Sequence, residues 1–196
     1  MTRSIIPFIL LSVLLAIPDT AAGSRRVHRD GLTICAMIIK ELTAGRVDLE
    51  TGQTLSLAIA RAGNKHFGRV TCGDMWLYMA LAHVESGFQS NIVNHLNCRG
   101  MFQVHAPSWA RKFGLKYRDL LDPEINADSG IRVFKYYLHL YGGIVPALSA
   151  YNSDHPRASR GFARVVLSTR DRIKKRYAQL YLALRDSRKE EDSAPF

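Results

Sequence analysis

The sequence has few of the residues that metal centres and disulfide-rich folds require. Three cysteines are present among 196 residues, at Cys35, Cys72 and Cys98. No two of them form the closely spaced Cys-x-x-Cys pair that is typical of structural zinc sites. His83 and His95 lie near the last two cysteines in the chain, but the resulting set matches no zinc-binding spacing. We therefore expect no bound metal.

Signals for cofactors, repeats and linkers are also missing. No glycine-rich loop of the kind that holds phosphates is present, no segment repeats, and no Gly/Ser-rich linker divides the chain. A length of 196 residues suits one domain with a substantial core. With 47% hydrophobic and 22% charged residues, the composition is that of a globular protein rather than a disordered chain. The sequence predicts one domain without a cofactor.

Acidic residues are scarce relative to basic ones. The chain has 17 Asp and Glu against 27 Lys and Arg, a net charge of +10, which favours polyanionic partners such as nucleic acid, an anionic cell wall or a membrane surface. Several of these cations fall between Arg170 and Arg176. A solvated helix face is the default interpretation of that run, and contact with a wall or membrane is the alternative.

Only one stretch is long and apolar. Arg3 precedes an apolar run from Ile5 to Ile17, and the small residues Thr20-Ala21-Ala22 follow. This pattern is typical of a secretory signal, and the run is shorter than the roughly 20 residues of a membrane span. We expect residues 1–22 to be a signal peptide and the protein to be exported to the periplasm or cell envelope; an uncleaved anchor is the alternative. Export argues against a nucleic-acid partner.

Helical spacing of apolar residues dominates the rest of the chain. The segment 49–67 is ambiguous, because part of it alternates like a strand, but its alanines favour a helix. Capping residues and breakers predict the following helices: 30–42, 49–67, 74–86, a short one from Ala106, one from Asp122-Pro123 to Tyr141, 146–152, one around Phe162–Val166, and a last one capped by Ser168 or Thr169. The sequence predicts an all-α domain at 23–184 and a charged tail at 185–196.

One carboxylate occupies an unusual place. The segment from Met75 to Ala82 is almost wholly apolar, Asp74 is a candidate N-cap, and Gly87 is a candidate stop. Glu85 therefore lies in the last turn of a buried helix, where burial and the negative helix end both oppose its ionisation. A carboxylic acid that stays protonated near neutral pH can act as a general acid. The alternative is a solvated helix-end Glu.

Three short motifs give this position a context. They are Glu85-Ser86-Gly87-Phe88, then Gly100-Met101-Phe102-Gln103-Val104, then Ala150-Tyr151-Asn152. In this order and spacing they resemble the lytic transglycosylase domain, which is related to goose-type lysozyme. The resemblance covers roughly 73–181 and implies the helical lobe of lysozyme-like enzymes.

The resemblance also implies roles for individual residues. Glu85 would be the catalytic acid and base on the glycosidic bond between N-acetylmuramic acid and N-acetylglucosamine, leaving 1,6-anhydromuramoyl ends. Peptidoglycan would be the substrate, and a secretion apparatus is a further candidate partner. The expected substrate-binding residues are Ser86, Met101, Phe102, Gln103, Tyr151 and Asn152, with Met101 and Phe102 as walls of the groove.

Two points stay open at this stage. Asp154 stands where the family usually has Gly; it could orient a water and favour hydrolysis, as in goose-type lysozyme, or simply end a helix. A non-catalytic wall-binding or secretion-scaffold protein on the same fold is the third alternative. Cys72 and Cys98 bracket the helix of Glu85 and its loop, so that they form either a disulfide or buried thiols.

Overall fold

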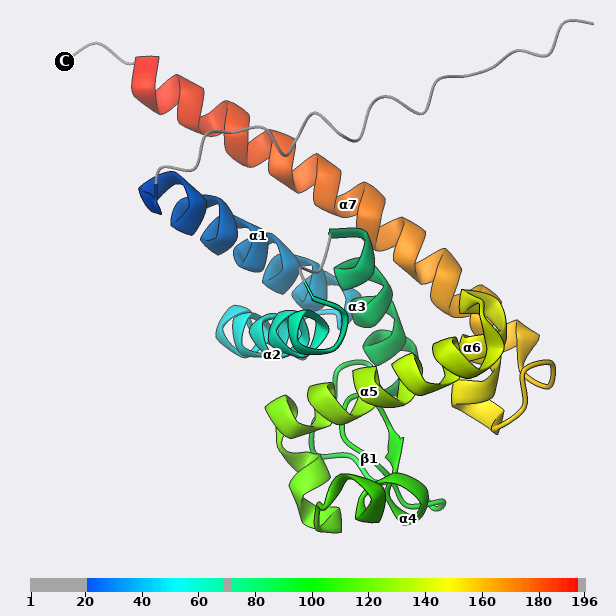
Figure 1. Ribbon diagram of the computed structural model, residues 1–196. Helices are drawn as coiled ribbons and strands as arrows, with labels where there is room; N and C mark the ends of the chain where they lie inside the picture. The colour runs from blue at the N-terminus through cyan, green and yellow to red at the C-terminus, as the bar shows by residue number, and fades with distance from the viewer. Residues whose placement is uncertain (1–20, 69–71, 194–196) are drawn as a thin grey trace, which may run out of the picture.

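The computed structural model describes residues 21–68 and 72–193. The predicted signal peptide, residues 1–22, thus lies almost wholly outside the described residues. Within them the prediction of an all-α fold is confirmed: helices make up nearly all regular structure, and one small two-stranded sheet accompanies them (Figure 1). No helix among the described residues is both long and apolar enough to cross a membrane.

The elements follow one another as seven α-helices, two 3-10 helices and two short strands in the described part of the chain. They are α1 (Ala21–Leu42), α2 (Leu49–Phe67), α3 (Cys72–Ser86), β1 (Cys98–Arg99), β2 (Val104–His105), α4 (Ala106–Trp109), 3-10 helices at Arg111–Phe113 and Tyr117–Leu121, α5 (Pro123–Tyr141), α6 (Ile144–Ser153) and α7 (Arg160–Ser193).

Most predicted helix boundaries are confirmed by their caps. The ambiguous segment 49–67 is helix α2, and the side chain of Asp48 accepts a hydrogen bond from the Thr51 amide at 2.7 Å. Asp122 caps α5 in the same way, at 2.9 Å from the Ile125 amide. Gly142 ends α5 in the left-handed conformation, at φ 66°. Local sequence signals therefore determine where these helices begin and end.

Several boundaries differ from the prediction. Helix α1 begins at Ala21 rather than at the expected residue 30. Helix α3 begins at Cys72, so that Asp74 lies inside its first turn and is not the N-cap. Helix α7 is continuous from Arg160, whereas we expected a new helix to start at Ser168 or Thr169. Buried Val166 and Ile173 lie seven residues apart on one face of α7, and no Gly or Pro separates them. The helix also continues beyond Leu184, through charged residues that we expected to form a tail.

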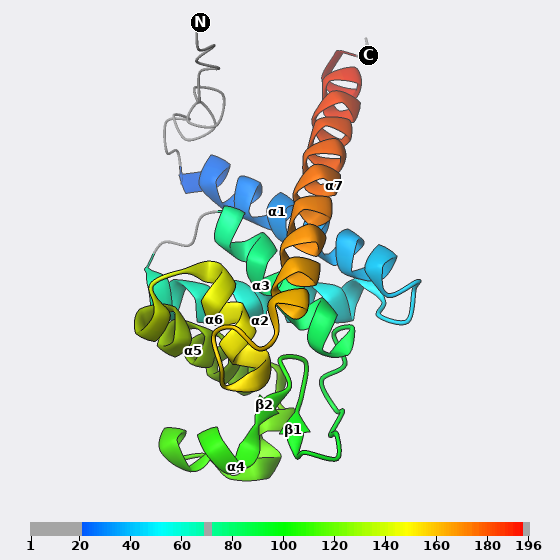
Figure 2. The same ribbon diagram turned by 90° about the vertical axis from the view of Figure 1, so that its right-hand side faces the viewer.

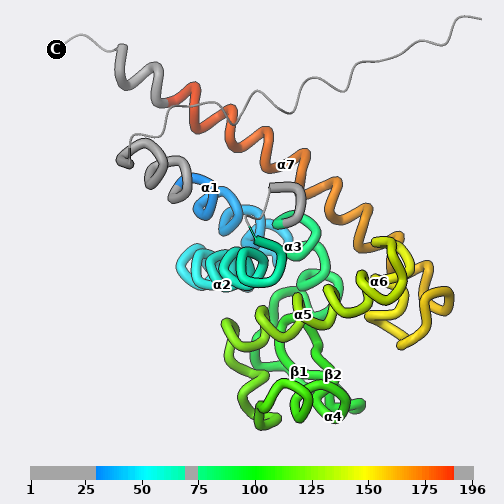
Figure 3. The backbone as a smooth tube through the Cα atoms, in the orientation of Figure 1, coloured from blue at the N-terminus to red at the C-terminus, as the bar shows by residue number. Residues whose placement is uncertain are grey.

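Helix α3 lies at the centre of the molecule in both ribbon views (Figures 1 and 2). All its residues from Met75 to Ala82 are buried. In the backbone trace α7 runs along α3 and α2 lies beside it, while α5 passes below α3 and packs on both α2 and α6 (Figure 3). The apolar sequence of α3 is therefore the consequence of burial on every side.

The loop after α3 is held by hydrogen bonds of its own side chains. It leads into an antiparallel hairpin in which Cys98 pairs with His105 and Arg99 with Val104. The side chain of Asn94 accepts hydrogen bonds from the amides of Leu96, at 2.9 Å, and Cys98, at 3.0 Å. Loop asparagines thus satisfy backbone amides that have no ladder partner.

A buried asparagine on α5 holds the hairpin turn in place. Asn126 accepts a hydrogen bond from the Phe102 amide and donates to the carbonyls of Arg99 and Leu120, each at 2.8 Å. The turn can approach this closely because of Gly100, which has φ 71° and where a Cβ would lie 2.5 Å from the Leu120 carbonyl oxygen. Sequence reasoning missed Asn126, because a polar residue inside a helix gives no sign of what it bonds.

We predict that Asn126→Ala lowers the free energy of unfolding by about 3 kcal/mol or more. The substitution leaves a buried amide and two carbonyls without partners, at roughly 1–3 kcal/mol for each unsatisfied group. Urea denaturation followed by circular dichroism measures the change. Asn91→Ala, at an exposed position in the loop, is the matched control and should be nearly neutral. Equal stability of the two variants would contradict the role given to Asn126.

Candidate active site

Glu85 lies in the last turn of α3, where the buried helix reaches the hairpin. Gly87 follows in a left-handed conformation, at φ 60°, and its amide closes the helix on the His83 carbonyl at 2.8 Å. Burial raises the pKa of Glu85 to about 8, yet part of the residue stays exposed. The carboxylic acid is therefore neutral at pH 7 and still within reach of a ligand, as a general acid must be.

Side chains from two other elements lie close to this acid. Tyr151, from α6, has a pKa well above its usual value, first because it is buried and next because the Glu85 charge is near. The pKa of Cys98, in β1, is raised by burial and to a smaller extent by the charges of Glu85 and Asp154. The three sequence motifs are thus neighbours around Glu85.

Ser86 joins the first motif to the second. Its hydroxyl donates to the Met101 carbonyl at 2.8 Å and accepts from the Gln89 amide at 3.1 Å. Ser86 is buried, so that these contacts occupy its hydroxyl. Ser86 thus connects α3 to the hairpin turn, and its binding of substrate stays a prediction.

Met101 and Phe102 are core residues and do not line a groove as predicted. Both have no exposed surface. Phe102 packs directly on Gly130 of α5, where an added Cβ would lie 2.4 Å from the Cβ of Phe102. The Phe102 carbonyl accepts a hydrogen bond from the Tyr151 hydroxyl at 2.7 Å. The second motif is therefore part of the core, and it contacts the other motifs through its backbone carbonyls rather than through the Met101 and Phe102 side chains.

Gln103 and Asn152 remain candidates for contact with a sugar. Gln103 is partly exposed in a left-handed conformation at φ 45°, and its side-chain amide donates to the Gly100 carbonyl at 2.9 Å. Asn152 is exposed in the last turn of α6, next to Tyr151. An amide side chain offers both a donor and an acceptor to an acetamido sugar.

Asp154 is the residue that follows α6. It ends the helix in the left-handed conformation, at φ 56°, which Gly adopts freely and Asp tolerates. Its carboxylate accepts a hydrogen bond from the Tyr137 hydroxyl of α5. The Asp154 side chain is thereby held at the rim of the site, as a helix-ending residue with a fixed orientation.

The Cys72–Cys98 disulfide is not formed. Cys98 carries a free thiol near Glu85, whereas Cys72 begins the helix whose last turn holds Glu85. At 1.5 Å per residue, roughly 20 Å separates the two ends of α3, far more than the 7 Å between Cα atoms that a disulfide allows. Spacing in sequence did not reveal this, because the two residues bracket a straight helix rather than a turn.

Glu85→Gln should change the pH dependence of stability. The pKa of Glu85 is raised from 4.5 to about 8, so that the folded state holds this proton more tightly than the unfolded chain. The resulting stabilisation is complete below pH 4.5 and is lost as the pH rises through 8. Relative to Glu85→Gln, wild-type stability should fall by up to about 1.4 kcal/mol per pH unit in that window.

Urea denaturation at several pH values measures this difference. Glu50→Gln, at an exposed position at the start of α2, is the control and should follow the wild type. A constant difference in unfolding free energy between wild type and Glu85→Gln from about pH 4.5 to 8 would show that burial does not perturb Glu85.

The site can now be compared with known proteins. No curated protein and no solved structure matches the chain significantly. A family model described as the transglycosylase SLT domain matches residues 73–177. This match covers more than half of the chain and includes all three motifs around Glu85, from the helix that carries the acid to Tyr151. The chain therefore belongs to the transglycosylase SLT domain family, within the lytic transglycosylase and lysozyme-like superfamily.

Proposed function

We propose that the protein is a peptidoglycan lytic transglycosylase that cleaves between N-acetylmuramic acid and N-acetylglucosamine and leaves 1,6-anhydromuramoyl ends. Its family acts on peptidoglycan. The observation that supports the specific reaction is the position of Glu85, a neutral carboxylic acid where the three motifs meet. General acid catalysis needs this protonation state at the start of the cycle.

In the first step Glu85 donates its proton to the bridging glycosidic oxygen. The bond between this oxygen and the anomeric carbon of the muramoyl sugar breaks, and the leaving N-acetylglucosamine keeps the proton on its new hydroxyl. The anomeric centre becomes cationic while Glu85 becomes a carboxylate. That carboxylate is favourable beside the developing positive charge, although burial disfavours it in the free enzyme.

In the second step the Glu85 carboxylate takes the proton of the C6 hydroxyl on the same muramoyl sugar. The C6 oxygen attacks the anomeric carbon and closes the 1,6-anhydro ring, and Glu85 is again protonated. Because the substrate supplies its own nucleophile, one carboxylate suffices, in contrast to the two of most glycosidases. Gln103 and Asn152 are the residues that we propose to hold the acetamido sugars.

Hydrolysis is the second candidate reaction, and Asp154 is the observation that favours it. An inverting hydrolase uses a second carboxylate to activate a water across the sugar ring. The charges of Asp154 and of Glu85 both contribute to the raised pKa of the Cys98 thiol, so both carboxylates lie near Cys98. The hydrogen bond from Tyr137 fixes one oxygen of the Asp154 carboxylate, however, and Asp154 ends the helix; both observations support a structural role over a catalytic one.

We also propose that the protein acts outside the cytoplasm, in the periplasm or cell envelope. The support is the signal-like sequence of residues 1–22 together with the location of peptidoglycan, the substrate of the family. A scaffold in a secretion apparatus would share the fold and location, but would not need a neutral acid at Glu85. Activity of the purified protein on peptidoglycan separates the enzyme from the scaffold.

Glu85→Gln should abolish cleavage of purified peptidoglycan while the fold is retained. The amide is nearly isosteric but cannot donate and retake the proton, a function worth roughly a hundred- to ten-thousand-fold in rate. Release of soluble muropeptides measures the rate, and circular dichroism monitors the fold. Glu50→Gln serves as the control and should keep wild-type activity. A fully active Glu85→Gln would remove this residue from the mechanism.

The muropeptides from wild type should carry 1,6-anhydro ends, and Asp154→Gly should yield the same products. Mass spectrometry separates the two reactions, because an anhydro product is lighter than a reducing-end product by one water. Tyr137→Phe, which removes the donor to Asp154 and keeps the carboxylate, is the companion variant. Mainly reducing ends from wild type that shift to anhydro ends in Asp154→Gly would identify a hydrolase with Asp154 as its second carboxylate.

A further inference from the structure

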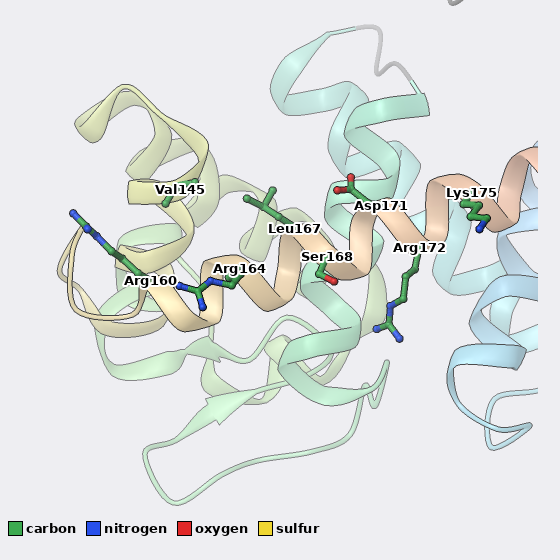
Figure 4. A pocket seen from close by; sticks show the side chains of 8 residues that line it. All are labelled: Val145, Arg160, Arg164, Leu167, Ser168, Asp171, Arg172 and Lys175. Carbon is green, nitrogen blue, oxygen red and sulfur yellow. The ribbon is translucent and has the colours of Figure 1, made fainter.

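A row of cations covers one face of α7, on the side of the helix away from the core. Arg160, Arg164, Arg172 and Lys175, which we call the basic face, line a shallow hollow of about 730 Å³ together with Val145, Leu167, Ser168 and Asp171 (Figure 4). All four cations are exposed. They recur at three to eight residues along one helix, so that they share one side of it.

The opposite side of α7 contains the residues that pack on the domain. Ala163 and Val166 have no exposed surface, and Ile173 has 1%. Most of the basic face therefore points outward from the molecule, whereas the Arg172 side chain turns back toward α3 and donates a hydrogen bond to the Thr169 hydroxyl at 3.1 Å. Between Arg160 and Lys175 it extends for roughly 22 Å, at 1.5 Å per residue along a straight helix. A face of this length and shallow shape suits an extended surface rather than a small ligand.

The positive charge of this face has no ion-pair partner among the described side chains. Within residues 30–68 and 75–187, no ion pair involves Arg160, Arg164, Arg172 or Lys175. The one acid of the hollow, Asp171, pairs with Arg170 at 2.8 Å, a cation outside the face. Uncompensated like charges repel one another, so that an external anionic partner gains affinity by relieving the repulsion.

Exposed apolar side chains adjoin these cations. Val145, at the start of α6, lines the same hollow as Arg160 and Arg164 and is 44% exposed. Ile144, the preceding residue, is 40% exposed. The boundary between headgroups and acyl chains of a bilayer offers both anionic phosphate and apolar surface.

We propose that the basic face of α7, with Ile144 and Val145 at its edge, docks the protein on an anionic phospholipid surface. The cations bind lipid phosphates, and the two apolar side chains enter the boundary region between headgroups and acyl chains. The proposal does not depend on the glycosidic reaction, since none of these residues belongs to the site around Glu85.

Docking through this face would hold the active site near the membrane. Arg172 points from α7 toward the end of α3 (Figure 4), and its charge, after burial, contributes to the lowered pKa of His83. His83 lies one helical turn or less from Glu85. Helix α6 also connects the two regions, because Val145 lies near its start and Tyr151 near its end. The docked enzyme would therefore act on glycan strands that lie close to the bilayer.

Co-sedimentation with vesicles tests the proposal. The full chain is mixed with vesicles of phosphatidylglycerol and phosphatidylcholine, or of phosphatidylcholine alone, and should bind only the anionic ones. Replacing Arg160, Arg164, Arg172 and Lys175 by Gln should weaken binding roughly 600-fold, from about fivefold for each cation near the surface. Binding should also weaken as salt shortens the Debye length from about 10 Å at 0.1 M to about 3 Å at 1 M.

Two controls make the result specific. Replacing Arg111, Lys112, Lys116 and Arg118 by Gln removes the same charge from exposed positions after α4, at the end of the molecule far from α7 (Figure 2), and should leave most of the binding intact. Replacing the three arginines of the basic face, Arg160, Arg164 and Arg172, by Lys keeps the charge and should retain binding. Ile144→Ser with Val145→Ser should lower binding while its salt dependence remains.

Several outcomes would overturn the proposal. Equal binding to both kinds of vesicle, or equal loss in the two charge-removed variants, would mean that no specific face docks. Loss of binding to purified peptidoglycan with unchanged vesicle binding would assign the face to the wall. The variant without the four cations should keep the wild-type rate on soluble glycan fragments, so that failure of docking and failure of the proposed reaction give different results.

Discussion

Burial of α3 on every side is the constraint on which the rest of the structure depends. Met75 to Ala82 fill the centre of the domain, and the helix ends only where it meets the hairpin. The last turn must therefore place Glu85 at the margin of the core, where burial raises its pKa to about 8. The same feature provides stability and chemistry, because the surroundings that exclude water from the core also keep this acid protonated.

The other two motifs meet Glu85 at that margin, and polar groups hold them there. Ser86 bonds to the Met101 carbonyl, Tyr151 to the Phe102 carbonyl, and Asn126 to the backbone on both sides of the turn. Each of these side chains binds the backbone of the hairpin turn. Satisfied buried hydrogen bonds fix a turn more sharply than apolar contacts do, since a displaced partner leaves a polar group unpaired.

Helix α7 serves the core and the surface at once. One face completes the domain with Ala163, Val166 and Ile173, and the other presents uncompensated cations beside exposed Val145. The default interpretation of a charge run is a solvated helix face. Within the run at Arg170–Arg176, Arg170 and Arg176 are paired with acids, whereas Arg172 and Lys175 belong to the basic face, which has Val145 as an apolar neighbour.

The sequence by itself determined the helical class, most helix ends and the buried helix-end position of Glu85. Caps such as Asp122 and breakers such as Gly87 act through neighbouring backbone groups, and the apolar run before Glu85 signals burial directly. Only the tertiary structure decided that Met101 and Phe102 are core residues, that Ser86 binds backbone, that Asn126 holds the turn and that Cys98 remains a thiol. These outcomes depend on which distant residues meet, and contacts between α3, the hairpin and α5 leave no periodic signal in the chain. Local interactions depend on residues that are close in sequence, whereas the contacts of a side chain with distant elements are fixed only when the helices pack.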